Sequence, residues 1–344
     1  MRDFTSPLPS LDGTNILVTG GTGSFGNAFV RAVLDRYRPR RLVVFSRDEL
    51  KQYEMANALG AQTEGRGPLR FFIGDVRDRG RLEMALRDID IVVHAAALKH
   101  VPAAEYNPFE CINTNVLGAE NVVQAAIRAG VKKVVALSTD KAVNPINLYG
   151  ASKLASDKIF VAANNLSGSG GTRFAVVRYG NVLGSRGSVV PFFRKLIAEG
   201  APSLPITDPR MTRFWITLSQ GVNFVLSSLE MMEGGEIFVP KIPSMLVTEL
   251  ARAMAPDLPQ HVVGIRPGEK LHEAMISADD ARVTVDRGDR YVILPTFSQW
   301  RGDSMVRPDD RPVPDGFIYA SDSNDEWLDA DRLSAMLAEL GPTH

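Results

Sequence analysis

Residues 15–34 read NILVTGGTGSFGNAFVRAVL and carry a combined strand, turn and helix pattern. It begins with an apolar run suited to a buried strand. Gly20, Gly23 and Gly26 then recur at three-residue intervals, at the point where a helix is expected to begin. A dinucleotide pyrophosphate needs such a turn, because small residues let it approach the main chain and the start of a helix offers N–H groups and a positive dipole end. The stretch therefore predicts the first βαβ unit of a dinucleotide-binding domain.

Further apolar runs follow, separated by amphipathic stretches of helical length. They are RLVVFS (41–46), RFFIGD (70–75), IVVHAA (91–96), KVVALS (133–138) and FAVVRYG (174–180). Fully apolar strands that alternate with helices indicate a parallel sheet covered on both faces. We therefore predict an α/β fold with a doubly wound, Rossmann-type parallel sheet.

The rhythm of strands and helices divides the chain into three parts. It is regular over residues 13–180, the predicted dinucleotide-binding domain, which also holds the candidate catalytic residues. Prolines and short elements dominate residues 181–295, the predicted smaller C-terminal lobe for the substrate. Residues 296–344 form a tail rich in Asp, Pro and Ser, whose NDEWLDADRLSAMLAEL stretch is suited to a terminal helix.

Composition narrows the classes of function. The chain of 344 residues has a formal net charge of −1, which gives no reason to expect a nucleic-acid partner. Cys111 is the only cysteine, so an intrachain disulfide is excluded and a reducing compartment is expected. No segment approaches the roughly 20 apolar residues of a membrane span. We expect a soluble, cytoplasmic protein without a membrane partner.

The end of the second predicted strand bears on the choice of cofactor. NAD-selective sites usually carry an acid there for the ribose 2′-hydroxyl. Ser46 and Arg47 stand at that point, with Lys51 one turn later, and this set suits the 2′-phosphate of NADP. The alternative is that Arg47 is solvated and Asp48 binds the ribose.

Other residues at the carboxyl ends of the predicted strands complete the cofactor site. Asp75 and Val76 are placed to contact adenine, and small alanines after the fourth strand allow close passage, although simple core packing explains them almost as well. The complete predicted set is Gly20, Thr22, Gly23, Ser24, Phe25, Gly26, Ser46, Arg47, Lys51, Asp75, Val76, Ala95, Ala97, Tyr149 and Lys153.

The stretch STDKAVNPINLYGASK (138–153) holds the candidate catalytic groups. Tyr149 and Lys153 are four residues apart, so they share one face of a helix, and Thr139 offers a hydroxyl. These groups suffice for hydride transfer at an alcohol carbon. Asp140 and Lys141 are an acid and an amine beyond that need, with a loop salt bridge as the alternative.

These motifs resemble those of a known family. The Gly20-x-x-Gly23-x-x-Gly26 turn with Tyr149-x-x-x-Lys153 is similar to the extended short-chain dehydrogenase/reductases, which act mainly on nucleotide sugars. In their 4,6-dehydratases the threonine is followed by Asp-Glu, whereas here it is followed by Asp-Lys. The Asp-Lys pair is similar to that of the inverting UDP-N-acetylglucosamine 4,6-dehydratases of pseudaminic acid biosynthesis. Further strings resemble the same group of enzymes: FSRDELKQ, AALKHVPAAEYNP, RYGNVLGSRGSVVPFF, PITDPRMTRFW, GGEIFVPKIPSM and GIRPGEKLHE.

The resemblance covers roughly residues 13–295 and implies a reaction. C4 of the sugar is oxidised with Tyr149 as base, water is eliminated across C5 and C6, and hydrogen returns to C6 with inversion at C5. Lys141 is the candidate base for the C5 proton and Asp140 the candidate acid for the C6 hydroxyl. This requires a lowered pKa for Lys141 and for Tyr149, and a protonated Asp140. A simple ion pair between Asp140 and Lys141 would defeat the scheme.

The second half of the chain supplies candidates for binding the UDP-sugar. Guanidinium groups match phosphate oxygens, and ligands of such folds bind at the carboxyl edge of the sheet. The predicted substrate contacts are Lys99, Asn181, Val182, Arg186, Thr207, Arg213, Arg266 and Glu269. The histidines lack metal-ligand spacing, so no metal is expected.

Three interpretations remain open at this stage. The first is the C5-inverting dehydratase, which by resemblance would be a homo-oligomer, a hexamer, serving flagellin glycosylation. The second keeps the fold and substrate but makes the enzyme a retaining 4,6-dehydratase or a 5,6-dehydratase. The third is a catalytically silent NADP-binding regulator, against which the joint presence of Thr139, Asp140, Lys141, Tyr149 and Lys153 argues strongly.

Overall fold

The computed structural model describes residues 2–62, 67–297 and 305–338. Parallel strands form the larger part of its main sheet, and each predicted apolar run supplies one of them. They are β1 (Asn15–Thr19), β2 (Arg41–Ser46), β3 (Leu69–Ile73), β4 (Ile91–His94), β5 (Lys133–Thr139), β6 (Arg173–Tyr179) and β10 (Ile237–Pro240). The predicted doubly wound α/β fold is confirmed.

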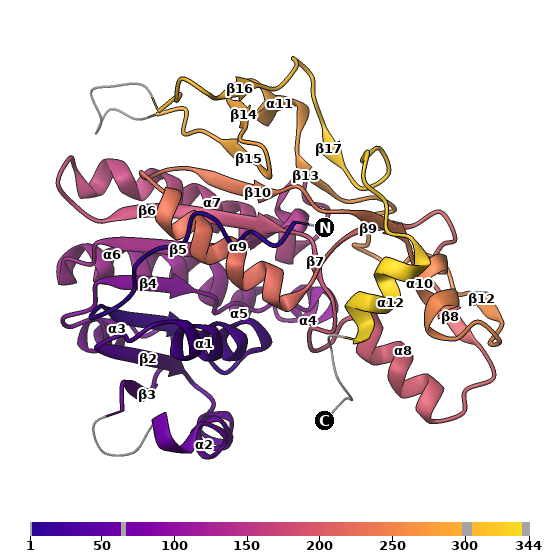
Figure 1. Cartoon of the computed structure of the whole chain (residues 1–344), viewed down its shortest axis with the longest axis horizontal. Coiled ribbons are helices and arrows are strands. Elements are labelled where there is room, and N and C mark those ends of the chain that lie inside the picture. The colour runs from indigo at the N-terminus through magenta and orange to yellow at the C-terminus, as the bar shows by residue number, and fades with distance from the viewer. Residues whose placement is uncertain (1, 63–66, 298–304, 339–344) are drawn as a thin grey trace.

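Antiparallel strands extend this sheet at one edge. They are β14 (Thr284–Asp286), β15 (Arg290–Ile293) and β16 (Arg311–Pro312). The resulting 10-stranded sheet has the order β16-β14-β15-β10-β6-β5-β4-β1-β2-β3 (Figure 1). The chain beyond residue 180 therefore returns to the main sheet, in addition to forming a lobe.

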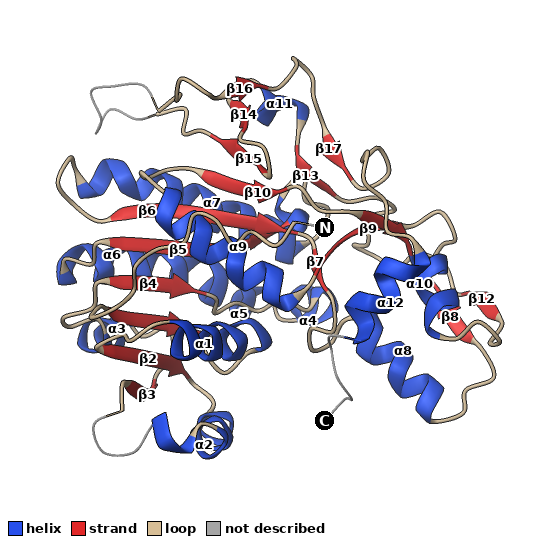
Figure 2. Cartoon of the chain, viewed as in Figure 1, coloured by secondary structure: helices blue, strands red, loops and turns tan. Residues whose placement is uncertain are grey.

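Helices cover both faces of the sheet (Figure 2). On one face α1 (Ser24–Arg36) packs against α9 (Leu218–Met231). The opposite face is covered by α3 (Arg79–Ala85), α6 (Gly118–Ala129) and α7 (Leu148–Ser167). Shorter helical elements lie at the ends of strands: α2 (Glu49–Ala58), η1 (Gly60–Gln62), α4 (Val101–Tyr106), α5 (Pro108–Ile112), the π-helix η2 (Asn113–Leu117) and η3 (Asp140–Ala142).

The smaller lobe lies beyond the carboxyl ends of the central strands (Figure 1). Its strands are β7 (Asn181–Val182), β8 (Leu204–Ile206), β9 (Thr212–Ile216), β11 (Ser244–Leu246), β12 (Gln260–Val262), β13 (Ala274–Ile276) and β17 (Tyr319–Ala320). Its helices are α8 (Val189–Ala198), α10 (Val247–Met254) and α12 (Ala330–Ala338), and the short α11 (Ala278–Ala281) precedes β14. β9, β11 and β7 form a three-stranded sheet, with β11 antiparallel to β9.

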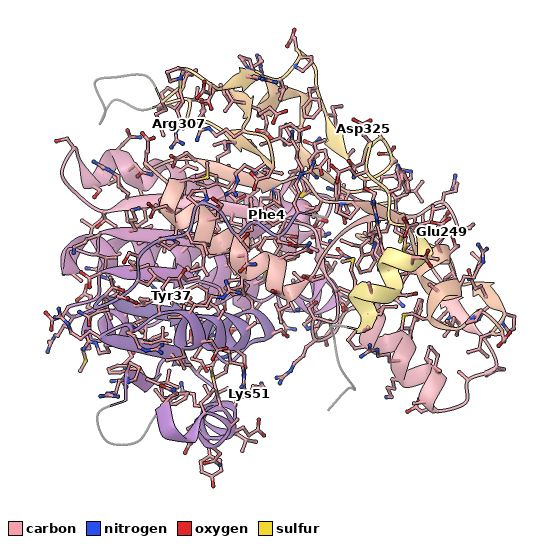
Figure 3. The ribbon with its side chains drawn as sticks, in the orientation of Figure 1. Phe4, Tyr37, Lys51, Glu249, Arg307 and Asp325 are labelled. Carbon is pink, nitrogen blue, oxygen red and sulfur yellow. The ribbon has the colours of Figure 1, made fainter. Side chains whose placement is uncertain are left out.

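Both ends of the described chain are packed against other elements. Near the N-terminus, Phe4 lies over α9 and meets Phe224 edge to face, with ring centroids 4.9 Å apart (Figure 3). At the other end, α12 buries Leu333 and Met336 against Trp215 and its neighbours in the lobe. α12 falls within the stretch for which a terminal helix was predicted, and residues 298–304 and 339–344 of the predicted tail lie outside the described residues. The three predicted domain boundaries remain predictions.

Candidate active site

The glycine-rich turn has a main-chain conformation that only small residues allow. Gly20 has φ of +64°, and a Cβ atom built there would lie 2.8 Å from the main-chain nitrogen of Ala96. A Cβ on Gly26 would collide with the main chain of Gly21. Gly23 is the N-cap residue of α1 and supplies no side-chain cap, so the first N–H groups of the helix are left for a ligand. This turn fits a dinucleotide pyrophosphate.

The polar residues after β2 are occupied with one another. The Ser46 hydroxyl is buried, lies 2.9 Å from the Thr22 hydroxyl and accepts the main-chain N–H of Asp48 at 3.3 Å. Asp48 caps α2 by accepting the Lys51 N–H at 3.0 Å. Its carboxylate also accepts a hydrogen bond from the Lys51 ammonium, which lowers the pKa of Asp48. Asp48 is therefore engaged in capping and ion pairing, and Lys51 is charge-compensated.

Arg47 reaches toward the next strand. Its guanidinium is 56% exposed and lies 3.6 Å from the Asp75 carboxylate. Burial would raise the pKa of Asp75, but hydrogen bonds from Arg77 and the charge of Arg47 outweigh it and lower the pKa. Val76 is buried beside this carboxylate, and its carbonyl accepts a hydrogen bond from Asn121. Arg47 and Asp75 thus meet at the edge where adenosine was predicted to lie.

The alanines after β4 lie beside the glycine turn. The main-chain N–H groups of Ala95 and Ala96 both donate to the hydroxyl of Thr19 at 3.2 Å. Ala97 follows and is exposed. The main chain of this segment is the part that a side chain on Gly20 would strike. It therefore forms one wall of the turn, as expected for close passage of a cofactor.

Arg186 lies on the cofactor side rather than deep in the lobe. Its main-chain N–H donates to the Ser24 hydroxyl at 3.4 Å, and its charge acts on Asp48. Ser24 begins α1, and Phe25 stacks on Phe29 within the same helix. The predicted cofactor residues Ser24 and Phe25 thus lie at the start of α1. The main chain of Arg186 thus lies against the start of α1 while its side chain is exposed, and the substrate contact predicted for Arg186 stays a prediction.

The predicted catalytic residues converge at the end of β5. Thr139 ends the strand, and its hydroxyl donates to the Asp140 carboxylate at 2.9 Å. Tyr149 and Lys153 project from the first turns of α7, where both are buried. The Lys153 ammonium donates to the Leu137 carbonyl at 2.7 Å, which fixes it beneath the strand end.

The two titratable groups of α7 respond differently to burial. Burial raises the pKa of Tyr149 to about 12, against the charge of Lys141 and a hydrogen bond with Thr139, which lower it. Burial lowers the pKa of Lys153, and nearby Asp157 opposes this. The protein alone therefore does not lower the Tyr149 pKa as the sequence-based scheme required.

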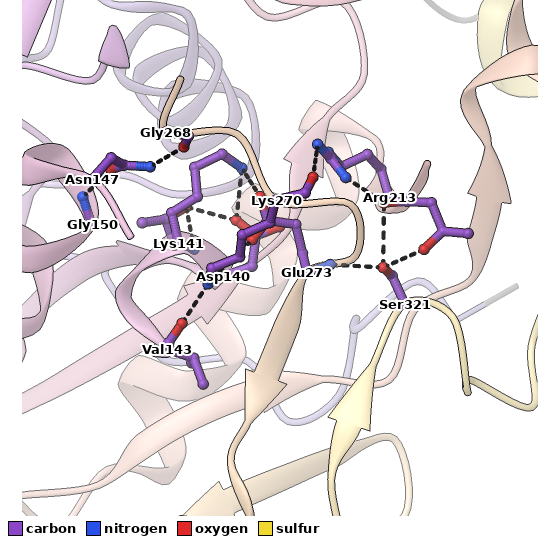
Figure 4. Close-up of polar contacts among 12 residues, drawn as sticks. Asp140, Lys141, Val143, Asn147, Gly150, Arg213, Gly268, Lys270, Glu273 and Ser321 are labelled. Atoms are coloured by element: carbon purple, nitrogen blue, oxygen red, sulfur yellow. Dashed lines mark hydrogen bonds and ion pairs between the residues drawn. The ribbon is translucent and has the colours of Figure 1, made fainter. Parts of the chain in front are cut away.

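Asp140 and Lys141 belong to a chain of alternating charges, the charge cluster Asp140–Lys141–Glu273–Lys270 (Figure 4). The Lys141 ammonium lies 3.0 Å from Asp140 Oδ1 and 3.2 Å from Glu273 Oε1. Lys270 Nζ lies 3.7 Å from Glu273 Oε2 and donates to the Val143 carbonyl at 2.6 Å. Asp140 is 0% exposed and Glu273 2%, whereas the Lys141 side chain is 25% exposed. Lys141 is therefore the member of the Asp140–Lys141–Glu273 triplet that faces the open side.

This cluster corrects the expected state of Lys141. Burial would lower the pKa of Lys141, but the charges of Asp140 and Glu273 outweigh it and raise the pKa well above its ordinary value. The ion pair with Asp140 that the simple scheme excluded is present. The prediction of a lowered Lys141 pKa is wrong for the protein without substrate, because two buried carboxylates face one ammonium.

Glu273 and Lys270 were not among the predicted site residues. Both lie in the GIRPGEKLHE string, from which only Arg266 and Glu269 were taken. The three-residue spacing of Lys270 and Glu273 was the available signal. Their role could not be read from it, because their partner Lys141 lies more than a hundred residues earlier in the chain.

Arg213 has a different role from the predicted grip on diphosphate. Its buried guanidinium donates to the main-chain carbonyls of Thr212 at 2.6 Å, Leu271 at 3.0 Å and Lys270 at 2.9 Å. These bonds hold the segment that carries Lys270 and Glu273 against β9. Arg213 thus positions the charge cluster (Figure 4).

The segment with Arg266 and Glu269 docks onto the start of α7. The Asn147 amide donates to the Gly268 carbonyl at 2.7 Å, and Asn147 also caps α7. The Arg266 guanidinium is 60% exposed and stands 4.0 Å from the Glu269 carboxylate. The hydrogen bond therefore places the segment with Arg266 and Glu269 beside the start of α7. The Arg266 side chain is exposed there and can contact a ligand.

The remaining predicted substrate residues lie on separate elements. Lys99 is exposed on the segment after β4, and Thr207 follows β8. Asn181 and Val182 form β7, where Asn181 pairs with Trp215 of β9. Lys99, Thr207 and the pair in β7 thus come from three different parts of the chain.

Two further features bear on the class of protein. Within the described residues, His, Cys, Asp and Glu side chains do not assemble into a group able to hold a metal ion. None of the helices in the described ranges has the length and apolar composition needed to cross a bilayer.

Comparisons with known proteins identify the family of the chain. A family model described as polysaccharide biosynthesis protein matches residues 16–295. A UDP-N-acetylglucosamine 4,6-dehydratase (inverting) from Campylobacter jejuni subsp. jejuni serotype O:23/36 (strain 81-176) is 57% identical over 327 residues, covering 94% of this chain and 96% of that protein.

Solved structures show the same architecture. Pen from Bacillus thuringiensis has 33% identity and a TM-score of 0.86, covering 96% of this chain and 99% of that chain. DesIV, a dTDP-glucose 4,6-dehydratase from Streptomyces venezuelae solved with NAD and TYD bound, has 27% identity and a TM-score of 0.64, covering 75% and 87%. A nicotinamide dinucleotide cofactor agrees with these neighbours, and the family resemblance predicted from the motifs is confirmed. The chain belongs to the polysaccharide biosynthesis protein family of extended short-chain dehydrogenase/reductases, as a relative of the inverting UDP-N-acetylglucosamine 4,6-dehydratases.

Proposed function

We propose that the protein is an NADP-dependent, configuration-inverting UDP-N-acetylglucosamine 4,6-dehydratase, a hydro-lyase. The product is UDP-2-acetamido-2,6-dideoxy-β-L-arabino-hex-4-ulose, and the reaction is the first step of pseudaminic acid biosynthesis. The observation that carries the proposal is the contact of 3.0 Å between Lys141 Nζ and Asp140 Oδ1, directly after Thr139 and beside Tyr149. An amine and an acid that share one proton are what elimination of water needs beyond an alcohol-oxidation site.

The oxidation at C4 uses the residues of β5 and α7. A nicotinamide dinucleotide held at the Gly20–Gly26 turn would supply the hydride acceptor for C4 and the hydride donor for C6. Tyr149 accepts the proton of the C4 hydroxyl, helped by the Thr139 hydroxyl. Lys153, held on the Leu137 carbonyl, contributes positive charge that favours the phenolate. The ketone formed at C4 acidifies the C5 proton.

Elimination uses the shared proton of Asp140 and Lys141. In water the ion pair is strongly favoured, because the reference pKa values differ by about six units. A sugar that covers Lys141 removes water and disfavours separated charges, so the proton moves from Lys141 to Asp140. Lys141 then takes the C5 proton, and Asp140 gives its proton to the departing C6 hydroxyl as water. The pair is then charged again, with Lys141 an ammonium and Asp140 ionised. Return of hydride to C6 is completed by a proton delivered to C5 from the opposite face of the sugar, and this proton balances the one that Tyr149 took from the C4 hydroxyl.

Substrate binding is assigned to the elements around this pair. Arg266 is open to the diphosphate, and the guanidinium fork matches phosphate oxygens. Asn181, Thr207 and Lys99 remain candidates for the nucleotide and sugar. We further propose a cytoplasmic homo-oligomer, a hexamer by resemblance, that serves flagellin glycosylation.

The test is incubation with UDP-N-acetylglucosamine in heavy water, followed by proton NMR. We expect a C6 methyl signal, loss of one water, deuterium at C5 and the inverted C5 configuration. C6 should gain protium from C4, without accumulation of reduced cofactor. A product with retained C5 configuration or an exocyclic double bond assigns one of the other dehydratase activities, and no conversion with bound cofactor assigns the silent regulator.

A further inference from the structure

Lys141 is held by two carboxylates that come from distant parts of the chain. Asp140 is its neighbour in sequence, whereas Glu273 stands at the start of β13. We propose that Glu273 is a positioning residue of the dehydration, whose carboxylate keeps Lys141 oriented and able to hold the proton taken from C5. The inference rests on the proposed function and assigns a further residue to the same site.

Burial separates Glu273 from the substrate. Its side chain is 2% exposed, while the Lys141 side chain in front of it is 25% exposed. Only Lys141 is therefore placed to touch a sugar, and Glu273 acts through it. An ion pair buried behind a partly exposed ammonium keeps its strength, because solvent screens it little.

The main chain around Glu273 is fixed on both sides. Its N–H donates to Ser321 Oγ at 3.0 Å, and its carbonyl accepts the Ser321 N–H at 2.7 Å. Arg213 holds the carbonyls of Lys270 and Leu271 just before it. The carboxylate is therefore presented to Lys141 by a braced segment of main chain.

The charges explain why a second carboxylate is useful. While the shared proton is on Asp140, that acid is neutral and gives Lys141 little electrostatic support. Glu273 remains negative 3.2 Å away and stabilises the ammonium that forms when Lys141 takes the C5 proton. Lys270 Nζ lies 3.7 Å from Glu273 Oε2 and adds a second positive charge beside that carboxylate. The remaining oxygens, Asp140 Oδ2 and Glu273 Oε2, have no hydrogen-bond partner among the described residues, so Asp140 keeps an oxygen for the proton it receives.

The sign of the expected pH effect follows from the groups that face Lys141. These are Asp140 on η3, Tyr149 on α7, Arg213 on β9 and Glu273 before β13. At high pH the shared proton of Asp140 and Lys141 is lost and the acid function disappears. Glu273 opposes that loss by its negative charge. Removing the charge therefore moves the alkaline limb of the kcat profile to lower pH.

The experiment compares Glu273→Gln with wild type and with Glu236→Gln. Glu236 is also buried and accepts main-chain N–H groups of residues 233 and 234, but it lies outside the charge cluster. Rates with UDP-N-acetylglucosamine are measured from about pH 6 to about pH 11, because the raised pKa of Lys141 places the wild-type alkaline limb at the upper end of this range. For Glu273→Gln we expect kcat reduced about tenfold to a hundredfold, less than the loss of a general base. We also expect KM within about twofold of wild type and an alkaline limb lower by about one unit or more. Glu236→Gln should keep the wild-type profile.

Identical profiles for Glu273→Gln and wild type, or equal shifts in both glutamine variants, would overturn the inference. Glu273→Asp provides a second measurement if the glutamine variant does not fold. Aspartate keeps the negative charge but places it farther from Lys141, because its side chain is shorter. We therefore expect kcat to fall while the alkaline limb of the pH profile stays in place. An alkaline limb displaced by a full pH unit would contradict the role of the charge. Wild type that does not dehydrate the substrate rejects the proposed function instead, so the two failures are distinguishable.

Discussion

Ser321 and Glu273 are joined by two hydrogen bonds across the edge of β17 and β13. The Glu273 N–H donates to Ser321 Oγ at 3.0 Å, and the Ser321 N–H donates to the Glu273 carbonyl at 2.7 Å. Ser321 Oγ also lies 2.7 Å from Thr212 Oγ1. Ser321 belongs to the C-terminal tail, beyond the residues matched by the family model, so the tail contributes to the site.

Ser321→Ala should lower the free energy of unfolding by about 1–3 kcal/mol, because the buried N–H of Glu273 loses its hydroxyl acceptor. Urea unfolding followed by tryptophan fluorescence measures this change. Ser334→Ala is the control, since Ser334 is exposed on α12 and its hydroxyl bonds only the Ala330 carbonyl. Equal stability of the two variants would show that the Ser321 hydroxyl does not brace the segment.

Lys141→Ala should stop elimination while binding of cofactor and UDP-N-acetylglucosamine persists. In the proposed mechanism oxidation at C4 depends on Tyr149 and Lys153, so the variant should accumulate bound reduced cofactor, seen as absorbance near 340 nm, with a 4-keto sugar. Leaving Asp140 and Glu273 without their ammonium should also lower the free energy of unfolding by about 3–5 kcal/mol.

Tyr149→Phe should show no hydrogen transfer from C4 to the cofactor. If Lys141→Ala dehydrated the substrate at nearly the wild-type rate, Lys141 would not be the base, and the Asp140–Lys141 ion pair would have only a structural role.

Arg47→Gln should weaken NADP binding about tenfold or more and leave NAD binding unchanged, because a charge-assisted contact to the 2′-phosphate is lost. Calorimetric titration of the cofactor-free protein measures both affinities. Arg128→Gln is the matched control, an exposed arginine that lies 3.5 Å from Glu83. Mass analysis of the nucleotide extracted from wild type should identify NADP. Parallel loss of both affinities, or extraction of NAD alone, would favour Asp48 as the ribose contact.

His94 should make the fold less stable in acid. Burial, with the nearby Lys153 charge, lowers the pKa of His94 to about 3. The unfolded chain takes up a proton below about pH 6.5 and the folded chain does not, so the stability present above that pH is lost as the pH falls toward 3. Between about pH 6 and about pH 4, wild type should lose about 2–3 kcal/mol more than His94→Asn.

In His94→Asn the asparagine can still meet the Thr19 hydroxyl, which lies 2.8 Å from the His94 ring. His261→Asn, which changes an exposed ring, should follow wild type. Urea unfolding at each pH gives the free energies. A His94→Asn variant that loses as much stability as wild type over this range would contradict the assignment.

The sheet could be predicted from the sequence because its signal is local. Each buried parallel strand is a continuous apolar run, and β1 to β6 coincide with the predicted runs. The return of the chain at β10, β14 and β15 was missed. β14 and β16 are too short for a pattern of their own, and β10 lies among prolines that favoured a loop interpretation.

The candidate site was predictable to the extent that its residues are neighbours in sequence. Thr139, Asp140, Lys141 and Tyr149 do converge at the end of β5. The ionisation of Lys141 was not predictable, because it depends on Glu273, which only the fold brings near. The inward orientation of Arg213 could not be predicted either. Its hydrogen-bond acceptors are main-chain carbonyls, which every residue has, so no sequence motif identifies them.

The repeated return of the chain from the lobe to the main sheet limits how the protein opens. Phe214 of β9, Ile276 of β13 and Tyr319 of β17 share one continuous apolar core with the strands of the main sheet. Rotation of the lobe as a rigid body would have to break that core and expose apolar area, at a cost of about 25 cal/mol per Å². Traffic of nucleotide sugar into and out of the site must therefore depend on local displacement of surface segments. Residues 261–267, which are exposed and precede the Gly268–Asn147 hydrogen bond, form one such surface segment.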